Sequence, residues 1–309
     1  MPVKLVRIAT RESPLALWQA EHVSRELKIV HPGLKVELVA IKTRGDIILD
    51  MPLSTVGGKG LFIKELEQAL LDHTADIAVH SMKDVTIDLP ENLELPVILK
   101  REDHRDVLIS NMHQSLADLP VGARVGTSSL RRQSQLRASR PDLDIKNLRG
   151  NVGTRLRKLD SNEFDAIVLA AAGISRLKLE KRICEYLSSD TMISAVGQGA
   201  IGIETRKNDH KIIDLLRPLN DPLTTAQLLA ERAFSRRLYG GCQLPIAAYA
   251  EIEGNEITLS GLVASVDGTR VYKDIIKGNA DQPAKSGTQL AEILLDRGAD
   301  EVLRELINA

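Results

Sequence analysis

Cysteine and aromatic residues are scarce in this sequence of 309 residues. It has two cysteines, Cys184 and Cys242, and aromatic side chains make up 3% of it. Two cysteines are too few for a disulfide framework, and they lack the C-x-x-C spacing of zinc and redox sites. Nucleic-acid binders usually have excess basic charge and stacking rings, whereas the net charge here is -1. We therefore expect neither a metal site nor a nucleic-acid partner.

Long apolar runs are also missing, and none approaches the length that a bilayer requires. The opening residues, MPVKLVRIATRES, pass from an apolar stretch to a polar turn without the apolar core of a signal peptide. We therefore expect a cytoplasmic protein without a membrane segment. No segment suggests an exposed interface, so we expect a monomer.

The remaining composition is that of a globular protein, with 43% hydrophobic and 27% charged residues. This length suits two or three domains. The opening predicts a β-α-β unit, with strands over 4–9 and 36–41 and a helix from Pro14 capped by Ser13. Arg11 and Ser13 then lie at the carboxyl end of a strand, where open α/β sheets bind ligands.

A glycine-rich stretch over 42–60 follows, and we interpret it as a loop or lid. Its Gly57-Gly58-Lys59-Gly60 lacks the spacing of a phosphate-binding loop. A helix over 62–71 and a buried strand over 76–80 come next. Ser81, Met82, Lys83 and Asp84 follow that strand directly. This position suits chemistry, but the residues alone favour a turn in which Asp84 caps a backbone N–H.

Residues 126–155 contain an unusual density of arginine, with Asp142 and Asp144 as the only acidic residues. Arginine binds carboxylate or phosphate through two parallel hydrogen bonds. In the same stretch, Gly126-Thr127-Ser128-Ser129 and Gly150-Asn151 each predict a turn that leads into a helix N-terminus, which also favours anions. A solvated, salt-bridged helix face is the alternative. We favour the anion site because arginines and helix starts coincide.

The rest of the chain predicts a second α/β unit and a third, α+β unit. Polar residues 100–106 and glycine-rich residues 196–200 are candidate crossings between two lobes. The last third predicts a helix over 222–238, strands over 246–252, 257–264 and 271–276, and helices over 284–297 and 299–308. Cys242 lies on a Gly-Gly-Cys loop, which is either incidental or a way to present a reactive thiolate. The helical spacing around Cys184 predicts a small core residue.

Taken together, these segments resemble the porphobilinogen deaminase, or hydroxymethylbilane synthase, family over nearly the whole chain. The matching blocks are ATRESPLALWQA, TRGD, VGGKGLF, DIAVHSMKDV, REDHRD, VGTSSLRRQSQL, LRGNVGTRL, AVGQGAIGIE, AERAF and GGCQLPI. The resemblance implies an α/β fold with two periplasmic-binding-protein-like lobes and a third, smaller α+β domain. It implies domain 1 over 1–99 and 200–217, domain 2 over 105–193, domain 3 over 222–309, and hinges near 100–104 and 194–199.

The resemblance also implies a transferase that joins porphobilinogen head to tail with loss of ammonia and releases a linear tetrapyrrole by hydrolysis. A dipyrromethane cofactor, attached by a thioether to Cys242, would prime the chain. Asp84 would be the catalytic carboxylate, because an anion stabilises the cation left when ammonia departs and can exchange protons. Every pyrrole bears an acetate and a propionate, so the arginines would bind carboxylates.

Further residues match the family's binding positions. The cofactor positions are Ser81, Lys83, Thr127, Ser129, Arg131, Arg132 and Arg155; the substrate positions are Arg11, Ser13, Ser128, Arg149, Arg176 and Gln198; the lid positions are Lys59 and Phe62. Three residues depart from the pattern: Thr55 stands where many relatives have lysine, and Thr86 and His104 replace prolines. Loss of proline loosens the local backbone. None of the three removes a group assigned to the chemistry.

Two other functions are open on the sequence alone. A non-catalytic, two-lobed polycarboxylate-binding protein would use the same lobes and arginines, but it would not need the glycine-presented Cys242. Nucleic-acid binding would show itself as salt-dependent binding of DNA.

Overall fold

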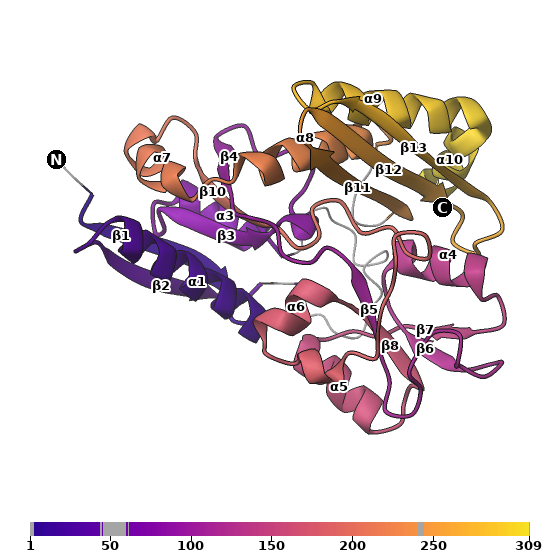
Figure 1. The fold of residues 1–309 in the computed structure, drawn as a ribbon. Helices are drawn as coiled ribbons and strands as arrows, with labels where there is room; N and C mark the ends of the chain where they lie inside the picture. The colour runs from indigo at the N-terminus through magenta and orange to yellow at the C-terminus, as the bar shows by residue number, and fades with distance from the viewer. Residues whose placement is uncertain (1–2, 44, 46–59, 61, 240–243, 309) are drawn as a thin grey trace. The chain divides into compact units, whose positions relative to one another are not determined.

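A computed structural model describes residues 3–43, 45, 60, 62–239 and 244–308 (Figure 1). The chain divides into two compact units, and among the described residues it changes from one unit to the other between residues 102 and 103, 199 and 200, and 225 and 226. Unit 1 contains strands β1 to β4 and β10, and unit 2 contains β5 to β9 and β11 to β13. The predicted sites at Cys242 and Lys59, and the departure at Thr55, lie outside the described residues. The three domain boundaries stay a prediction.

Unit 1 begins with the predicted β-α-β unit. Strands β1 (Leu5–Arg11) and β2 (Lys35–Ile41) pair in parallel, and helix α1 (Pro14–Val30) connects them. Ser13 is the N-cap of α1, and its hydroxyl accepts a hydrogen bond from the Ala16 N–H at 3.4 Å. Proline at the first helical position has no N–H to lose. The helix start was therefore predicted correctly.

The sheet of unit 1 has the strand order β2-β1-β3-β10-β4. Strand β3 (Ile77–Ser81) is parallel to β1, whereas β10 (Ile201–Arg206) runs antiparallel to β3 and to β4 (Leu93–Ile98). Helices α3 (Lys64–Leu71) and α7 (His210–Leu216) belong to the same unit. Strand β4 and helix α7 are absent from the sequence-based prediction, because both segments are short and interrupted by polar residues.

The first sheet of unit 2 repeats this topology with the order β7-β6-β8-β5-β9. Three strands are parallel, β6 (Arg124–Gly126), β7 (Asp144–Lys146) and β8 (Ala166–Ala170). Strand β5 (Asp106–Ile109) runs antiparallel to β8 and to the short β9 (Glu185–Tyr186). In both sheets, the strand that follows a predicted crossing runs antiparallel to its neighbours: β10 follows residues 196–200, and β5 follows residues 100–106. Helices α4 (Leu130–Ser139), α5 (Val152–Asp160) and α6 (Ala171–Arg176) complete this part.

The C-terminal part of unit 2 is an antiparallel meander covered by helices (Figure 1). Strands β11 (Ile246–Glu253), β12 (Glu256–Ala264) and β13 (Val271–Asn279) pair in sequence order. Helices α8 (Pro222–Arg237), α9 (Pro283–Leu294) and α10 (Asp300–Asn308) share one buried apolar cluster with this sheet. A Cβ at Gly287 would overlap the Ala230 carbonyl oxygen, so only glycine permits α8 and α9 to approach this closely.

This architecture confirms the predicted fold class, with two α/β lobes, each built on a five-stranded sheet, and a smaller α+β part. The prediction for Cys184 was wrong. Cys184 is partly exposed and does not lie in a helix. Its sulfur accepts a hydrogen bond from the Ser110 N–H and donates one to the Ser110 carbonyl, both at 3.3 Å. The apolar neighbours that suggested a helix instead flank the short edge strand β9.

His104 and Thr86, which replace prolines, both make hydrogen bonds. The Thr86 hydroxyl donates to the Asp88 carbonyl at 2.7 Å. In unit 2, His104 Nδ1 lies 2.7 Å from the Ser194 hydroxyl, and its ring stacks on Tyr249. Side-chain contacts thus fix segments that proline would have restricted through the backbone.

Two kinds of feature are absent from the described part of the chain. No helix there is both long enough and apolar enough to cross a bilayer. The same residues contain no group of three or more His, Cys, Asp or Glu side chains placed to hold a metal ion.

Candidate functional site

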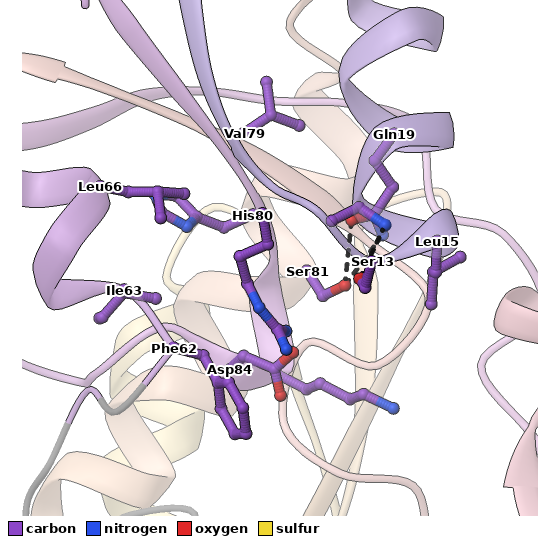
Figure 2. Close-up of a pocket in the computed structure, with 13 residues that line it drawn as sticks. Ser13, Leu15, Gln19, Phe62, Ile63, Leu66, Val79, His80, Ser81 and Asp84 are labelled. Atoms are coloured by element: carbon purple, nitrogen blue, oxygen red, sulfur yellow. Dashed lines mark hydrogen bonds between the residues drawn. The ribbon is translucent and has the colours of Figure 1, made fainter. Parts of the chain in front are cut away.

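A pocket in unit 1 opens at the carboxyl ends of β1 and β3, between α1 and α3 (Figure 2). Its volume is about 80 Å³. Its polar wall includes most of the unit 1 residues that the sequence analysis singled out. The described lining residues are Arg11, Ser13, Leu15, Ala16, Gln19, Phe62, Ile63, Leu66, Val79, His80, Ser81, Lys83 and Asp84.

A buried methionine fixes the turn that presents Lys83 and Asp84. The turn is the short 3-10 helix η1 (Met82–Asp84), which follows β3 directly. Met82 is 2% exposed, and its N–H donates to the Ala200 carbonyl at 3.0 Å. A Cβ at Gly202 would overlap the Met82 sulfur, so glycine at this position of β10 makes room for the anchor. With Met82 held inside, Lys83 and Asp84 are partly exposed at the pocket.

Gln19 positions Ser81 on the α1 side of the pocket. The Gln19 side chain is 2% exposed, and its Nε2 donates to the Ser81 hydroxyl at 2.8 Å, as Figure 2 shows. On the other side, the Arg11 guanidinium carbon lies 4.2 Å from the centre of the Phe62 ring. This is cation–π geometry, and it holds the charge of Arg11 at the pocket.

His80, which lines the pocket, forms a buried ionisable pair with Glu204. His80 Nε2 is 2.9 Å from Glu204 Oε2, and both side chains are nearly inaccessible. Burial, and next the charge of Glu204, raise the pKa of Glu67 above its ordinary value. The low dielectric around this group strengthens each of these interactions.

The second set of candidate residues lies in unit 2, again at carboxyl ends of parallel strands. Ser129 caps α4 and accepts from the Arg132 N–H, and Asn151 caps α5 and accepts from the Thr154 N–H. Both predicted helix starts are therefore correct. Thr127 is 2% exposed, and its hydroxyl accepts from the Ser129 N–H, while the Ser128 hydroxyl donates to the Leu148 carbonyl.

Arg131 and Arg132 are buried and share one carboxylate. They are 4% and 5% exposed, so the solvated helix face is wrong for both. Arg131 Nη2 lies 2.8 Å from Asp106 Oδ2, and Arg132 Nη2 lies 2.7 Å from Asp106 Oδ1. Burial alone would raise the pKa of Asp106, but the charges of Arg131 and Arg132 hold it well below its usual range. Burial also lowers the pKa of Arg131, an effect that Asp106 opposes.

The remaining arginines are held mainly through carbonyl groups. Arg155 Nε donates to the Gly150 carbonyl at 2.8 Å, and Arg176 Nη2 donates to the Gly199 carbonyl at 2.7 Å. Arg149 is partly exposed, and its Nη1 is buried without a hydrogen-bond partner. Arg131 Nε is also buried without a partner. Buried N–H donors without a partner fit an anionic ligand, since such donors are normally satisfied.

The segment over 194–199 is tied to its surroundings by buried side chains. Gln198 is 1% exposed, and its Nε2 donates to Asp106 Oδ1 and to the His104 carbonyl. Glu231 on α8 is fully buried, with Oε2 accepting from the Gly197 N–H at 2.7 Å and Oε1 accepting from the Ala250 N–H at 3.0 Å. One carboxylate therefore joins this segment to strand β11.

Glu231→Gln is expected to destabilise unit 2 by about 2 to 4 kcal/mol. Glutamine has one acceptor oxygen, so one of the two buried backbone N–H groups would face an N–H₂ group instead. Urea unfolding followed by circular dichroism measures the change. Glu251→Gln is the matched control, because Glu251 is exposed on β11 and should change stability by about 0.5 kcal/mol at most. Equal midpoints for the two variants would contradict this role.

Several of these residues were missed by the sequence analysis. Gln19 and Glu231 are polar residues at core positions of amphipathic helices, and that pattern would have indicated them. Asp106 is the last residue of the REDHRD block and begins an apolar strand. His80 and Glu204 lie in continuous apolar strands, where nothing in the sequence shows that they pair.

The structure brings the predicted residues into two groups. Unit 1 holds Arg11, Ser13, Phe62, Ser81, Lys83 and Asp84 around one pocket. Unit 2 holds Thr127, Ser128, Ser129, Arg131, Arg132, Arg149, Arg155, Arg176 and Gln198. The two groups differ in charge. The first has a carboxylate beside cations, and the second has an excess of cations.

Two family models match the chain. Residues 6–214 match the model described as porphobilinogen deaminase, dipyromethane cofactor binding domain. Residues 225–296 match the model described as porphobilinogen deaminase, C-terminal domain. The two matches follow each other and leave only short segments uncovered.

Solved structures with a similar fold include several binding proteins. A putative methionine-binding lipoprotein from Bacillus subtilis is 16% identical, with 72% of this chain and 92% of that chain covered and a TM-score of 0.45. The BvgS periplasmic VFT2 domain from Bordetella pertussis is 14% identical, with 69% and 85% covered and a TM-score of 0.43. A nutrient binding protein from Burkholderia cenocepacia, bound to methionine, is 14% identical, with 70% and 92% covered and a TM-score of 0.45.

Proposed function

Because this chain belongs to the porphobilinogen deaminase family, it polymerises porphobilinogen on a dipyrromethane cofactor, and we propose which of its residues perform the reaction. The gathering of Asp84, Lys83, Arg11 and Ser13 around one pocket carries the proposal. The pocket receives porphobilinogen, and the arginines of unit 2 hold the growing chain. The product is a linear tetrapyrrole.

Asp84 acts on the cation that forms when ammonia leaves porphobilinogen. Its carboxylate stabilises the positive charge that spreads onto the pyrrole N–H, and it accepts and returns protons as the new bond forms. The turn η1 fixes the carboxylate at the pocket because Met82 is anchored inside the sheet. Arg11 and Ser13 bind the carboxylates of the same pyrrole, so the carboxylate of Asp84 is left for the ring nitrogen.

The cofactor, when bound, supplies a nucleophilic pyrrole carbon to which the first substrate is joined. Cys242 is the proposed attachment residue. Arg131, Arg132 and Arg155, with Thr127 and Ser129, would hold its carboxylates. Lys83 and Ser81 are the further proposed cofactor residues. The buried N–H groups of Arg131 and Arg149 that lack a hydrogen-bond partner fit this assignment.

Arg11, Ser13, Ser128, Arg149, Arg176 and Gln198 are the proposed substrate residues, and Phe62 with Lys59 forms the proposed lid. Phe62 lies against the Arg11 guanidinium. An apolar ring at this position reduces access of water, which would otherwise react with the cation. The lid therefore favours addition of pyrrole over hydrolysis until the chain is complete.

Intact-protein mass spectrometry with and without porphobilinogen tests the proposal. We expect a mass excess of two linked pyrroles on the peptide containing Cys242, followed by single-pyrrole steps after substrate is added. If the purified chain carries no pyrrole and gains none from porphobilinogen, preformed tetrapyrrole product would be added to supply the primer. If the chain still gained no pyrroles but bound polycarboxylates, we would conclude that it is a non-catalytic binding protein.

Arg149→Leu is expected to slow elongation at particular chain lengths. Losing one charge-assisted hydrogen bond costs about 1.5 to 3 kcal/mol, which is about 10- to 150-fold in the affected step. Mass spectrometry of quenched reactions should show one intermediate accumulating. Arg157→Leu is the control, since Arg157 is exposed on α5 and donates to Thr154. Uniform loss of all intermediates in Arg149→Leu would point to misfolding instead.

We further propose a monomer that works in the cytoplasm. All proposed site residues come from one chain, so no second copy is needed to complete the site. A thioether requires a free Cys242 thiol, which a reducing compartment maintains. Sedimentation velocity of the cofactor-bearing protein tests the monomer, and fractionation of cells tests the location.

A further inference from the structure

Asp106 is the most enclosed charged residue that the assignments above leave without a role. It begins β5, it is 0% exposed, and it lies among four donors from two segments. Arg132 donates to Oδ1 through Nε at 3.1 Å and Nη2 at 2.7 Å, and Gln198 Nε2 donates to the same oxygen at 3.0 Å. Arg131 Nη2 lies 2.8 Å from Oδ2.

We propose that Asp106 is a positioning residue for the cofactor site, and that it fixes Arg131, Arg132 and Gln198 in their binding geometry before any carboxylate arrives. This inference rests on the proposed function, in which the two arginines hold the dipyrromethane. Asp106 acts through the arginines and has no surface of its own with which to contact a ligand.

The geometry favours positioning because both ends of each guanidinium are fixed. Arg131 Nη1 donates to the Ile193 carbonyl at 2.6 Å, and Arg132 Nη1 donates to the Val168 carbonyl at 2.9 Å. Asp106 supplies the second fixed point for each group. A planar group held at two points cannot rotate, and a guanidinium has more N–H groups than these contacts use. The unused donors, among them the buried Arg131 Nε, therefore keep constant directions.

The charges also favour a polyanionic ligand. One carboxylate faces two arginines that remain protonated in proteins, so the group has one positive charge in excess. If the protein had a second carboxylate here, it would neutralise the site and compete with the cofactor. If Asp106 were absent, the two arginine charges would lie side by side without a partner, at a high cost in free energy. A single shared aspartate keeps the arginines together and the site attractive to carboxylates.

Asp106→Asn tests the proposal in the full-length protein as purified. The amide keeps the size of the side chain, but its N–H₂ would face one of the guanidinium groups. We expect about a tenfold or greater drop in the fraction of folded molecules that carry the two-pyrrole mass, as is typical when a buried charge loses its partner. Turnover per cofactor-bearing molecule should also fall, because Arg131, Arg132 and Gln198 lose the carboxylate that fixes them.

Asp165→Asn is the matched control. Asp165 forms a similar paired contact with Arg124, at 3.2 Å to Nε and 3.0 Å to Nη2, but this ion pair is partly exposed. It should leave cofactor occupancy at the wild-type level. If Asp106→Asn has wild-type cofactor occupancy and turnover, and Asp165→Asn carries the cofactor, the positioning role of Asp106 is wrong but the proposed function stands. A wild-type protein without the cofactor mass would instead overturn the proposed function.

Asp106→Glu keeps the test decisive if Asp106→Asn does not fold. It retains the charge and moves the carboxylate by one methylene, so we expect folded protein with reduced occupancy and a lower turnover per loaded molecule. Circular dichroism checks the fold. Occupancy and turnover equal to wild type in Asp106→Glu would show that only the charge matters, and the positioning role would then be wrong.

Discussion

Asp84→Asn should fold, keep its covalent cofactor and lose about 10²- to 10⁴-fold in turnover. The amide has nearly the same shape as the carboxylate, but it has no negative charge for the pyrrole cation and cannot take up a proton. Losses of this size are typical when a general acid–base group or a preorganised electrostatic contact is removed. Asp84 is partly exposed at the end of η1, so its substitution should cost little stability. Single-turnover formation of the first pyrrole adduct, followed by mass spectrometry, measures the loss.

Asp72→Asn is the control for this experiment. Asp72 lies in the same unit, is exposed, and accepts a hydrogen bond from Gln68 Nε2 at 2.8 Å. It should turn over at the wild-type rate. Near-normal turnover in Asp84→Asn would remove Asp84 from the mechanism, and the buried pair of His80 and Glu204 would then be the next candidate for proton transfer.

Cys242→Ser should fold and have no pyrrole attached through sulfur, and its turnover should fall below detection. A serine hydroxyl is a much weaker nucleophile than a thiolate at neutral pH, so the thioether cannot form and an ether is not expected. Elongation without a primer has no acceptor for the first pyrrole. Intact mass before and after addition of tetrapyrrole product measures the attachment.

Cys184→Ser is a control that this chain supplies itself. Cys184 is the other cysteine, it is partly exposed, and its sulfur makes hydrogen bonds with the backbone of Ser110 and Arg182. Serine can make the same contacts with the Ser110 N–H and carbonyl. This variant should retain the two-pyrrole mass and the activity. Pigment on Cys242→Ser, or its absence from Cys184→Ser, would reverse the assignment of the attachment residue.

Local signals in the sequence determined the helix starts and the family. Ser13, Ser129 and Asn151 cap helices where predicted, because a cap needs only its own side chain and the next few residues. The long blocks of family sequence determined the reaction class in the same way. The sequence placed Arg131 and Arg132 near an anion site, but it did not show how they are held.

The tertiary structure decided the pairings, because they join residues far apart in the chain. Asp106 accepts hydrogen bonds from Arg132 and Gln198, and His80 is hydrogen-bonded to Glu204. Glu231 accepts hydrogen bonds from the N–H groups of Gly197 and Ala250. No periodicity in the sequence encodes which buried carboxylate meets which donor, since that depends on strand order and register. The sequence by itself therefore determined which groups are present, whereas the fold decided their burial, their partners and the excess of positive charge in unit 2.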